Sequence, residues 1–268
     1  MKKNRLIPIV LLRNGWIVQS KSFSEYQNLG NPVTSVKRLS EWASDEIIYI
    51  DISKDDKYDL RRDDQGYKNR DNFLDIIRDV SDVAFMPITV GGKIRSLKDI
   101  EQRLVSGADK ICINTIALDD PAFVELAARE FGSQCIVISI DAKLTDDGYR
   151  VFSNGGSTNT FLTPSQHAMI VQNNGAGEIL INSIDRDGRG NGYDLSLVSQ
   201  VTDSVSIPVI ACGGAGDWEH FSEAFDQTSV DAVAAANIFH YRDQSVFLAK
   251  KHLFDSGINV RRPDLIKI

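Results

Sequence analysis

The sequence has few of the residues that mark secreted or membrane-spanning proteins. Only 3 of its 268 residues are cysteines, too few for a disulfide framework, so we expect buried thiols in a reducing compartment. No apolar run reaches the roughly 18 residues that a transmembrane helix needs. The start, Met1 to Arg5, lacks the apolar stretch of a signal peptide. These features predict a cytoplasmic protein.

Basic residues and metal-ligand patterns are also scarce. The formal net charge is -7, and no basic stripe interrupts the chain, so we expect neither nucleic acid nor a membrane as a partner. Four histidines without ligand spacing are present: His167, His220, His240 and His252. We therefore expect no metal site and no cofactor. With 42% hydrophobic residues the chain can form a full core, and we expect one domain over residues 1–268.

What the sequence does contain is an internal repeat. A glycine pair, an amphipathic stretch and an aspartate occur twice, with Gly91 matching Gly213 and Asp109 matching Asp231, both at an offset of 122. An earlier segment with a glutamate before an apolar run also recurs. Two units of similar pattern therefore form one chain.

Each unit alternates short apolar runs with longer amphipathic ones, which is typical of a parallel sheet covered by helices. Eight strands are predicted, at residues 6–12, 47–52, 86–90, 111–113, 136–141, 179–183, 208–211 and 232–235. Eight such strands predict an α/β fold, a (β/α)₈ TIM barrel built from two duplicated half-barrels. An open, doubly wound sheet is the alternative, but it would not need a duplicated half.

One polar insertion interrupts the rhythm at about residues 54–72. It is too polar for a core and too long for an ordinary connection between a strand and a helix. Because it follows the second strand, it belongs to the face where barrel active sites form. We consider two interpretations, a solvated loop and a lid over the substrate.

Glycine pairs follow the third and seventh strands and predict phosphate sites. Backbone amides that glycine leaves uncovered at the start of a helix bind phosphate, although tight turns explain single glycines equally well. The two predicted pockets consist of Gly91, Gly92, Asn114 and Thr115, and of Gly213, Gly214, Ala236 and Asn237. Two pockets on opposite sides of one barrel imply an elongated ligand with an anionic group at each end.

Aspartates at the strand ends are the candidate catalytic acids and bases. Asp51 closes the second strand, Asp141 the fifth, and Asp187 follows the sixth. A carboxylate that points into the barrel mouth can transfer protons. The alternative for any one of them is capping of the next helix.

Four charged residues stand at the opposite ends of the strands. Arg5, Glu46, Lys110 and Glu178 each directly precede an apolar run. Two cations and two anions at the strand starts predict a ring of salt bridges across the bottom of the barrel. Such a ring either stabilises the fold or acts as a gate, and the cost of burying four charges favours the gate.

Specific motifs extend over nearly the whole chain. They include Arg5-Leu-Ile-Pro, Thr89-Val-Gly-Gly, Gly107-Ala-Asp-Lys-Ile-Cys-Ile-Asn-Thr, Ile140-Asp-Ala-Lys, Gly175-Ala-Gly-Glu-Ile-Leu, Ser183-Ile-Asp-Arg-Asp-Gly and Gly213-Gly-Ala-Gly. Together they resemble the cyclase subunit of imidazole glycerol phosphate synthase, the HisF family. The resemblance implies a (β/α)₈ barrel that receives ammonia from a separate, HisH-like glutaminase on its N-terminal face. It also implies an ammonia gate formed by Arg5, Glu46, Lys110 and Glu178, and a contact between Asp109 and the glutaminase.

The match is incomplete where the chemistry would occur. The family's acid/base pair corresponds to Asp141 and to Leu11, a leucine where an aspartate is expected. Gln19 replaces an expected lysine, Lys93 replaces a glycine, and the insertion at about 54–72 has no counterpart. Losing one member of an acid/base pair lowers a rate by about 10² to 10⁴.

Three functions are therefore considered. Our leading hypothesis is a specialised HisF-like subunit for surface-polysaccharide biosynthesis. It would pass ammonia through the barrel to amidinate an N-acetyl sugar, working with the glutaminase and a third amidotransferase protein. The first alternative is a working cyclase of histidine biosynthesis, with Asp51 or Asp187 replacing the absent aspartate and a phosphorylated substrate. The second is a non-catalytic barrel that activates the glutaminase.

Overall fold

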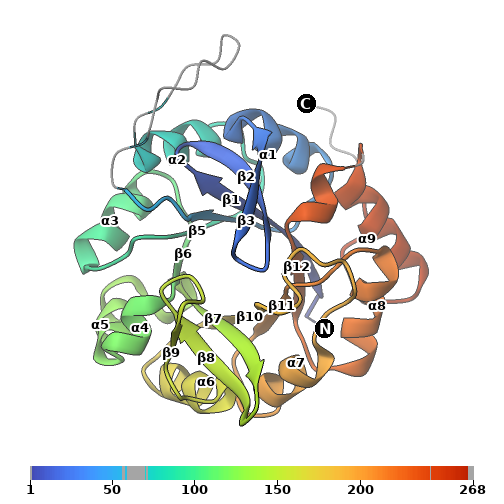
Figure 1. Ribbon diagram of the computed structural model, residues 1–268. Coiled ribbons are helices and arrows are strands. Elements are labelled where there is room, and N and C mark those ends of the chain that lie inside the picture. The colour runs from blue at the N-terminus through green and yellow to red at the C-terminus, as the bar shows by residue number, and fades with distance from the viewer. Residues whose placement is uncertain (1, 56–57, 59–69, 71, 242, 265–268) are drawn as a thin grey trace.

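The computed structural model describes residues 2–55, 58, 70, 72–241 and 243–264. Within these residues, eight parallel strands form the inner wall and helices surround them (Figure 1). The strands of the wall are β1 (Arg5–Arg13), β4 (Ile47–Asp51), β5 (Ile88–Gly91), β6 (Lys110–Ile113), β7 (Ile136–Thr145), β10 (Glu178–Ser183), β11 (Val209–Cys212) and β12 (Ala232–Ala235). No described helix is long and apolar enough to cross a membrane.

The wall closes on itself. Its strand order is β10-β11-β12-β1-β4-β5-β6-β7, and β7 pairs again with β10 in parallel, with Asp141 opposite Asn182. Strands β1 and β7 are four strands apart in either direction, so their ends face each other across the barrel. The predicted (β/α)₈ barrel is confirmed, all eight predicted strands are present, and the open-sheet alternative is wrong.

Alternation along each strand separates an inner from an outer layer. Side chains two residues apart point to the same face of a strand, so Ile7, Ile9 and Leu11 of β1 face the barrel interior. A buried apolar cluster fills this interior: Ile7, Ile9, Ile48, Cys112, Val137, Leu180, Ile210, Ala232 and Ala234. The intervening residues pack outward against the helices in the larger core cluster. This alternation decides which strand-end residues can reach the mouth.

Helices begin where the sequence supplies capping residues. The side chains of Asn31, Ser96 and Asp217 accept hydrogen bonds from backbone amides at the starts of α1, α3 and α8. The α-helices are α1 (Pro32–Glu41), α2 (Phe73–Ser81), α3 (Leu97–Val105), α4 (Thr115–Asp119), α5 (Ala122–Phe131), α6 (Pro164–Asn173), α7 (Leu195–Thr202), α8 (Trp218–Gln227) and α9 (Ser245–Asp255). Two short 3₁₀ helices are η1 (Ser133–Cys135) and η2 (Asn237–His240).

The repeat seen in the sequence reappears as matched hydrogen bonds. Asp109 Oδ2 accepts from the amide of Ile88 at 2.8 Å, and Asp231 Oδ2 accepts from the amide of Val209 at 3.0 Å. Each aspartate thus ties the start of one strand to the residue before the next. The same device at the same place in both halves agrees with two duplicated units.

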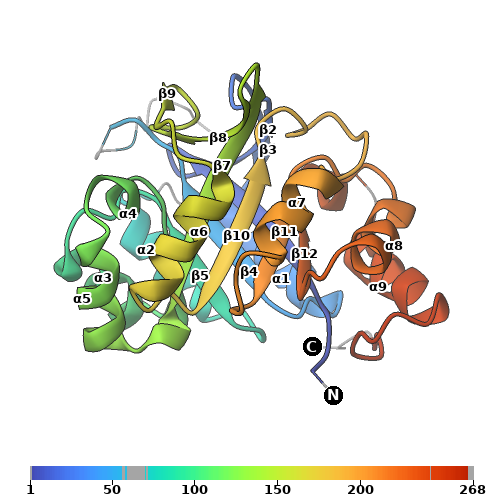
Figure 2. The ribbon, with the colours of Figure 1, turned by 90° about the horizontal axis from the view of Figure 1, so that it is seen from below.

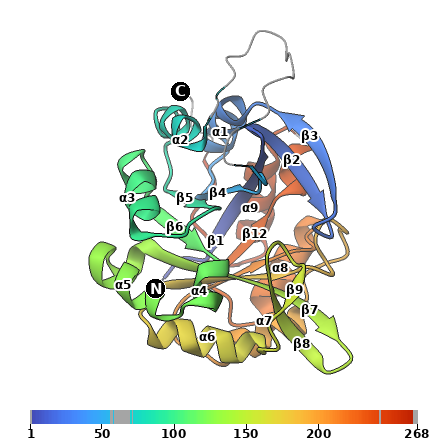
Figure 3. The same cartoon turned by 60° about the vertical axis from the view of Figure 1, so that its left-hand side comes forward.

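Two β-extensions were not anticipated from the sequence. One is a hairpin of β2 (Trp16–Lys21) and β3 (Glu25–Gly30), which continues antiparallel from the end of β1. The other consists of β8 (Gly148–Ser153) and β9 (Thr158–Asn159), which continue from the long strand β7. Both project from the same end of the barrel (Figures 2 and 3). We call this end, where the wall strands finish, the C-terminal mouth.

Candidate active site

Asp141 is the central acidic group of the C-terminal mouth. Alternation along β7 directs its side chain into the barrel, and the residue is 8% exposed. Asn114 Nδ2 donates to its Oδ2 at 2.8 Å, and Asn182 Nδ2 donates to its Oδ1 at 3.3 Å. The two amides hold the carboxylate from the neighbouring strands on either side. The sequence predicted Asp141 but not its contact with Asn182.

The environment of Asp141 favours its protonated form. Burial raises the pKa of its carboxyl group, and the charge of Asp187 raises it further, against the opposing effect of the two amides. The resulting pKa is about 6, instead of 3.8. A carboxyl group with such a pKa can both donate and accept a proton near neutral pH.

Across the barrel from Asp141, β1 contributes Leu11. Its backbone pairs with Ile50 of β4, and both side chains pack against the interior apolar cluster. Leucine has no proton to donate and no charge. Leu11, the residue at which the sequence comparison expects an aspartate, thus lies opposite Asp141.

Asp187 supplies a second carboxylate to the mouth, from the loop after β10. Its Oδ2 accepts from Ser20 Oγ at 2.7 Å and from the amide of Phe23 at 3.3 Å. Burial raises the pKa of Asp187, and these two hydrogen bonds partly oppose the shift. Because its charge acts on both Asp141 and the thiol of Cys212, Asp187 faces the same space as Asp141.

Asp51 is oriented differently from our expectation. It follows Ile50, which faces the interior, so its own side chain is on the outer side of β4. Its Oδ1 accepts from the amide and hydroxyl of Ser53, and its Oδ2 accepts from Tyr58 Oη at 3.2 Å. The prediction that Asp51 points into the mouth is wrong, and its carboxylate is engaged in local hydrogen bonds instead.

The predicted phosphate glycines have a clear steric role. Gly92 and Gly214 have φ angles of +100° and +106°, and a Cβ at either would approach a backbone oxygen of a neighbouring loop to about 2 Å (2.2 Å from Asp51 O and 2.1 Å from Gly192 O). Such close packing accounts for these glycines without a ligand. Phosphate binding at the two pockets therefore stays a prediction.

The remaining members of the two pockets lie at strand ends as expected. Thr115 begins α4, and Asn237 begins η2 directly after Ala236. The side chain of Asn114 bonds to Asp141, and Asn237 Nδ2 donates to the carbonyl of Ser20 at 2.8 Å. Gly91 ends β5, and a Cβ there would be 2.9 Å from the carbonyl oxygen of Cys112.

Lys93, which adjoins a predicted phosphate pocket in sequence, contacts the strand-end residue Asp51 and the start of the insertion. It has a φ of +55°, and its Nζ lies 3.6 Å from Asp51 Oδ2 and contacts the carbonyl of Asp55. The insertion at about residues 54–72 lies mostly outside the described residues, so its lid role stays a prediction.

The β2–β3 hairpin reaches across the mouth from β1 to the loops after β10 and β12 (Figure 1). The amide of Ser22 donates to the carbonyl of Asp187 at 3.0 Å. Gln19 bonds to Tyr241 and to Gln27 on the neighbouring strand. The hairpin thus covers part of the space above Asp141.

At the opposite end of the barrel, the four charged residues form the ring that the sequence predicted. We call Arg5, Glu46, Lys110 and Glu178 the charged ring. Arg5 bonds to Glu46 at 2.9 Å and to Glu178, and Lys110 Nζ lies 3.0 Å from each of the same two carboxylates. Thr89 Oγ1 also donates to Glu46, at 2.6 Å. Every member therefore has two oppositely charged partners.

Electrostatics stabilise the charged ring in its ionised form. Burial alone would lower the pKa of Arg5 and of Lys110, but the adjacent carboxylates outweigh it and the net shift is upward. The side chains of Glu46 and Glu178 are only 3% and 8% exposed. The ring therefore closes this end of the barrel with four charges that neutralise one another.

Asp109, the predicted contact of the glutaminase, lies at this same end of the barrel. It is exposed and directly precedes Lys110 of the charged ring. One of its oxygens is used by the amide of Ile88.

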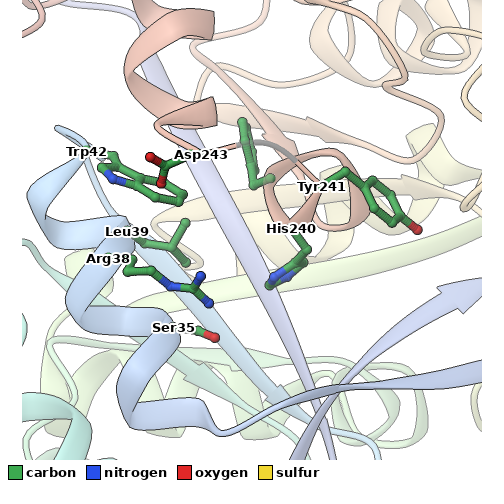
Figure 4. Close-up of a pocket in the computed structure, with 8 residues that line it drawn as sticks. Ser35, Arg38, Leu39, Trp42, His240, Tyr241 and Asp243 are labelled. Carbon is green, nitrogen blue, oxygen red and sulfur yellow. The ribbon is translucent and has the colours of Figure 1, made fainter.

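Another hollow, outside the barrel, is distinct from the C-terminal mouth (Figure 4). It measures about 130 Å³ and lies between α1 and η2; its lining is Ser35, Arg38, Leu39, Trp42, Phe239, His240, Tyr241 and Asp243. Burial and the charge of Arg38 lower the pKa of His240 to about 4, so this histidine is neutral at physiological pH.

The structure therefore defines a protein of the (β/α)₈ barrel class, with an acidic group in one mouth and a charged ring at the other end. The sequence matches the family model described as Histidine biosynthesis protein over residues 5–245. It is 40% identical over 262 residues to proteins named imidazole glycerol phosphate synthase subunit HisF from Hydrogenobaculum sp. (strain Y04AAS1) and Bacillus cereus (strain G9842). Each alignment covers 97% of this chain and 100% of the relative. This chain belongs to the histidine biosynthesis protein family and, within it, to the HisF family.

Proposed function

We propose that this protein is the ammonia-consuming barrel subunit of a two-protein glutamine amidotransferase. The observation that carries the proposal is that one barrel joins the charged ring at its N-terminal end to Asp141 at its C-terminal mouth. A HisH-like glutaminase would dock on the N-terminal end, near Asp109, and release ammonia beside the ring. Asp141 would then act where ammonia meets the substrate.

The barrel interior suits a small neutral molecule. Its lining between the ring and the mouth is mainly apolar and includes the small side chains of Ala232, Ala234 and Cys112. Ammonia can enter such a lining, whereas an ammonium ion would lose its hydration without a counter-charge. The charged ring must open for passage, because its ion pairs close the N-terminal end in this structure.

The first candidate reaction is the ring closure that forms imidazole glycerol phosphate. Its support is the family, since both relatives are named as subunits of imidazole glycerol phosphate synthase. In this reaction Asp141 would be one acid/base group, and Asp187 would be the second in place of the residue missing at Leu11. Asp187 suits the role because its charge acts on Asp141 and because burial raises its own pKa.

Two observations favour a second candidate, amidination of an N-acetyl sugar for surface polysaccharides. Leu11 removes the acid from the side of the mouth opposite Asp141, and Gln19 bonds to Tyr241 where a lysine is expected. A barrel that still receives ammonia could then serve a different acceptor, which a third protein would hand over. The names of the two relatives give this candidate no support.

A direct assay separates these candidates. The purified chain would be supplied with ammonium chloride and the ribulosyl aminoimidazole carboxamide nucleotide of histidine synthesis, without glutaminase. The first candidate predicts imidazole glycerol phosphate, with losses of about 10² to 10⁴ in rate for Asp141→Asn and for Asp187→Asn. No product from the intact, folded chain would eliminate that candidate and leave the sugar reaction and the non-catalytic barrel.

A non-catalytic barrel that only activates the glutaminase is the remaining possibility. It predicts that Asp141→Asn leaves product formation by the assembled complex unchanged, whereas both catalytic candidates predict a large loss. Because the variant keeps the shape of the side chain, a change in assembly is not expected to hide the result.

A further inference from the structure

The hollow between α1 and η2, on the outside of the barrel, is built from two elements that are far apart in the sequence (Figure 4). Ser35, Arg38, Leu39 and Trp42 are spaced by three and four residues along α1, so they lie on one face of that helix and form one wall of the hollow. The opposite wall comes from η2 and the residues after it, namely Phe239, His240, Tyr241 and Asp243.

Three hydrogen-bond donors of this lining have no hydrogen-bond partner among the described residues. They are the hydroxyl of Ser35, the guanidinium of Arg38 and the imidazole of His240. His240 is neutral at physiological pH, so one of its ring nitrogens still carries a hydrogen to donate. The charge of Arg38 acts on His240, and Figure 4 shows both side chains directed into the space between α1 and η2. The hollow therefore offers donors, one of them charged, to its occupant.

Arg38 is held in place without being neutralised. Its guanidinium carbon lies 6.0 Å from the centre of the Trp42 ring, and this contact with a buried aromatic side chain orients it. Asp243 also lines the hollow, but it forms no ion pair with Arg38 among the described residues and lies beside Trp42 in Figure 4. The positive charge of Arg38 is therefore available to an anion, which Asp243 would repel.

The size of the hollow limits what can occupy it. Its volume of about 130 Å³ is close to the roughly 150 Å³ of a cavity that admits benzene, so a group of only a few heavy atoms fits. Carboxylate and phosphate groups have this size, and their oxygens match the planar donors of a guanidinium. We propose that this hollow is a binding site for a small oxyanion, either a carboxylate or a phosphate, held by Ser35, Arg38 and His240. The site lies outside the barrel wall and is independent of the reaction in the C-terminal mouth.

The test is an NMR titration of the full chain with two probes in turn, inorganic phosphate and acetate, read at the backbone amides of Ser35, Arg38 and His240. We expect at least one probe to shift these amides saturably, with a Kd below about 10 mM, and the tighter probe identifies the class of oxyanion. Arg38→Ala should weaken binding more than about tenfold, the effect of losing a hydrogen bond to a charged group. Lys37→Ala is the matched control, because it removes an equal charge from an exposed position of α1 outside the lining, and it should change the affinity less than about twofold.

Asp243→Asn gives a second prediction, of opposite sign. Removing the negative charge from the lining should tighten binding about twofold or more at low salt, and the gain should shrink at high salt. Should Arg38→Ala unfold, Asp243→Asn carries the test, since Asp243 is exposed and lies outside the helices and strands.

Three results would overturn the proposal. Amides that respond to neither probe, or respond without saturation, would mean that the hollow holds only water. Equal weakening in Arg38→Ala and Lys37→Ala would mean that the probe is attracted to α1 without a specific site, and weaker binding to Asp243→Asn would mean that this residue holds the probe. Phosphate bound in the predicted pockets of the mouth would shift the amides near Gly91 and Gly213 instead, so the two sites are distinguished and failure here leaves the proposed function standing.

Discussion

The carboxyl group of Asp141 makes the stability of the fold depend on pH. Its pKa is about 6 in the folded protein and 3.8 in an unfolded chain. Above pH 6 the folded state therefore bears the cost of the buried charge, about 3 kcal/mol by linkage. The cost is relieved as the pH falls from 6 to 3.8, because the folded state takes up the proton first.

Asp141→Asn should remove this cost. We expect the variant to be more stable than the wild type at pH 8, with a difference that shrinks as the pH falls and disappears near pH 4. Urea unfolding at pH 4, 6 and 8 measures it. Asp147→Asn, on an exposed turn between β7 and β8, is the control and should change the free energy by less than about 0.5 kcal/mol at each pH. A constant difference across the three pH values would contradict the assigned shift.

His167 has the opposite pH dependence. It is fully buried on α6, neither ring nitrogen has a partner among the described residues, and burial lowers its pKa to about 4. Between pH 6.5 and 4 the unfolded chain binds a proton at His167 and the folded protein does not. The free energy of unfolding therefore falls by about 3 kcal/mol as the pH is lowered through this range.

His167→Leu should remove that dependence. The variant should also be more stable at neutral pH, because it eliminates two unpaired buried nitrogens. Comparing its unfolding free energy with that of the wild type at pH 7.5 and pH 4.5 gives the measurement. If the variant lost as much stability on acidification as the wild type, His167 would not be the responsible group.

Single residues also show what the sequence could and could not reveal about the site. Asp141 was predictable because a strand-end acid lies two residues beyond inward-facing Ser139 in a clear apolar run. The same alternation rule, applied to Ile48 and Ile50, would have excluded Asp51 from the mouth. Contacts such as Ser20 to Asp187 join residues 167 positions apart, and no local pattern indicates them.

The β2–β3 hairpin is held over the mouth by a few hydrogen bonds to the loop after β10. Ser20 Oγ donates to the Asp187 carboxylate, and a hydrogen bond to a charged group contributes about 1.5–3 kcal/mol. Ser20→Ala should therefore raise the opening frequency of the hairpin. We expect amide hydrogen exchange at Ser22 and Phe23 to accelerate by about tenfold or more.

Ser24→Ala is the matched control for this experiment. Ser24 Oγ donates to the carbonyl of Lys21 within the turn and not to Asp187, so its loss should leave the exchange of Ser22 nearly unchanged. Equal acceleration in both variants would mean that the turn itself, and not its tie to Asp187, controls opening.

The two hairpins are the elements that the sequence did not predict. A barrel strand is normally followed by a helix, and residues 16–30 contain too few apolar positions to distinguish a strand pair from a connecting loop. Their stability comes from pairing with the extended ends of β1 and β7, which is a tertiary effect. The eight wall strands were predictable because each is a buried apolar run.

A buried ion pair fastens α9 to the loop before β4. Lys250 is fully buried, and its Nζ donates to the carbonyl of Ala43 at 2.9 Å and contacts Asp45. Burial lowers the pKa of Lys250, and Asp45 partly opposes the shift. Asp45 also accepts from the amide of Leu6 at 3.0 Å, so the pair fixes the start of β1 beside the charged ring.

Lys250→Met should destabilise the fold by about 3–5 kcal/mol, because it leaves a carboxylate with reduced compensation in a buried site. The double variant Asp45→Asn with Lys250→Met should recover part of that loss, since no uncompensated charge remains. Thermal unfolding of both proteins measures the difference. A double variant less stable than Lys250→Met alone would contradict this account.

The duplicated halves produce a molecule whose two ends differ in chemistry. Arg5, Glu46 and Lys110 come from the first half and Glu178 from the second, yet they form one closed ring. The mouth is less symmetric, since Asp141 faces Leu11 across the barrel. The repeat was visible in the sequence because strand-start motifs are local. The difference between Asp141 and Leu11 across the mouth was not, because it depends on which strands lie opposite each other once the barrel closes.

The Arg5→Ala variant tests whether the charged ring acts as a gate for ammonia or only stabilises the fold as a plug. Arg5→Ala removes two ion pairs, and Lys110 still neutralises part of the charge on Glu46 and Glu178. If the ring gates ammonia, Arg5→Ala should lower the glutamine-dependent rate of the complex with glutaminase about tenfold or more. The rate driven by ammonium chloride should stay within about twofold of the wild-type rate, because that ammonia can reach the mouth from solvent. Lys2→Ala, which removes an exposed pair with Asp231 at the same end of the barrel, should change neither rate. A plug predicts instead that Arg5→Ala lowers both rates in parallel with the melting temperature, so the ratio of the two rates decides between them.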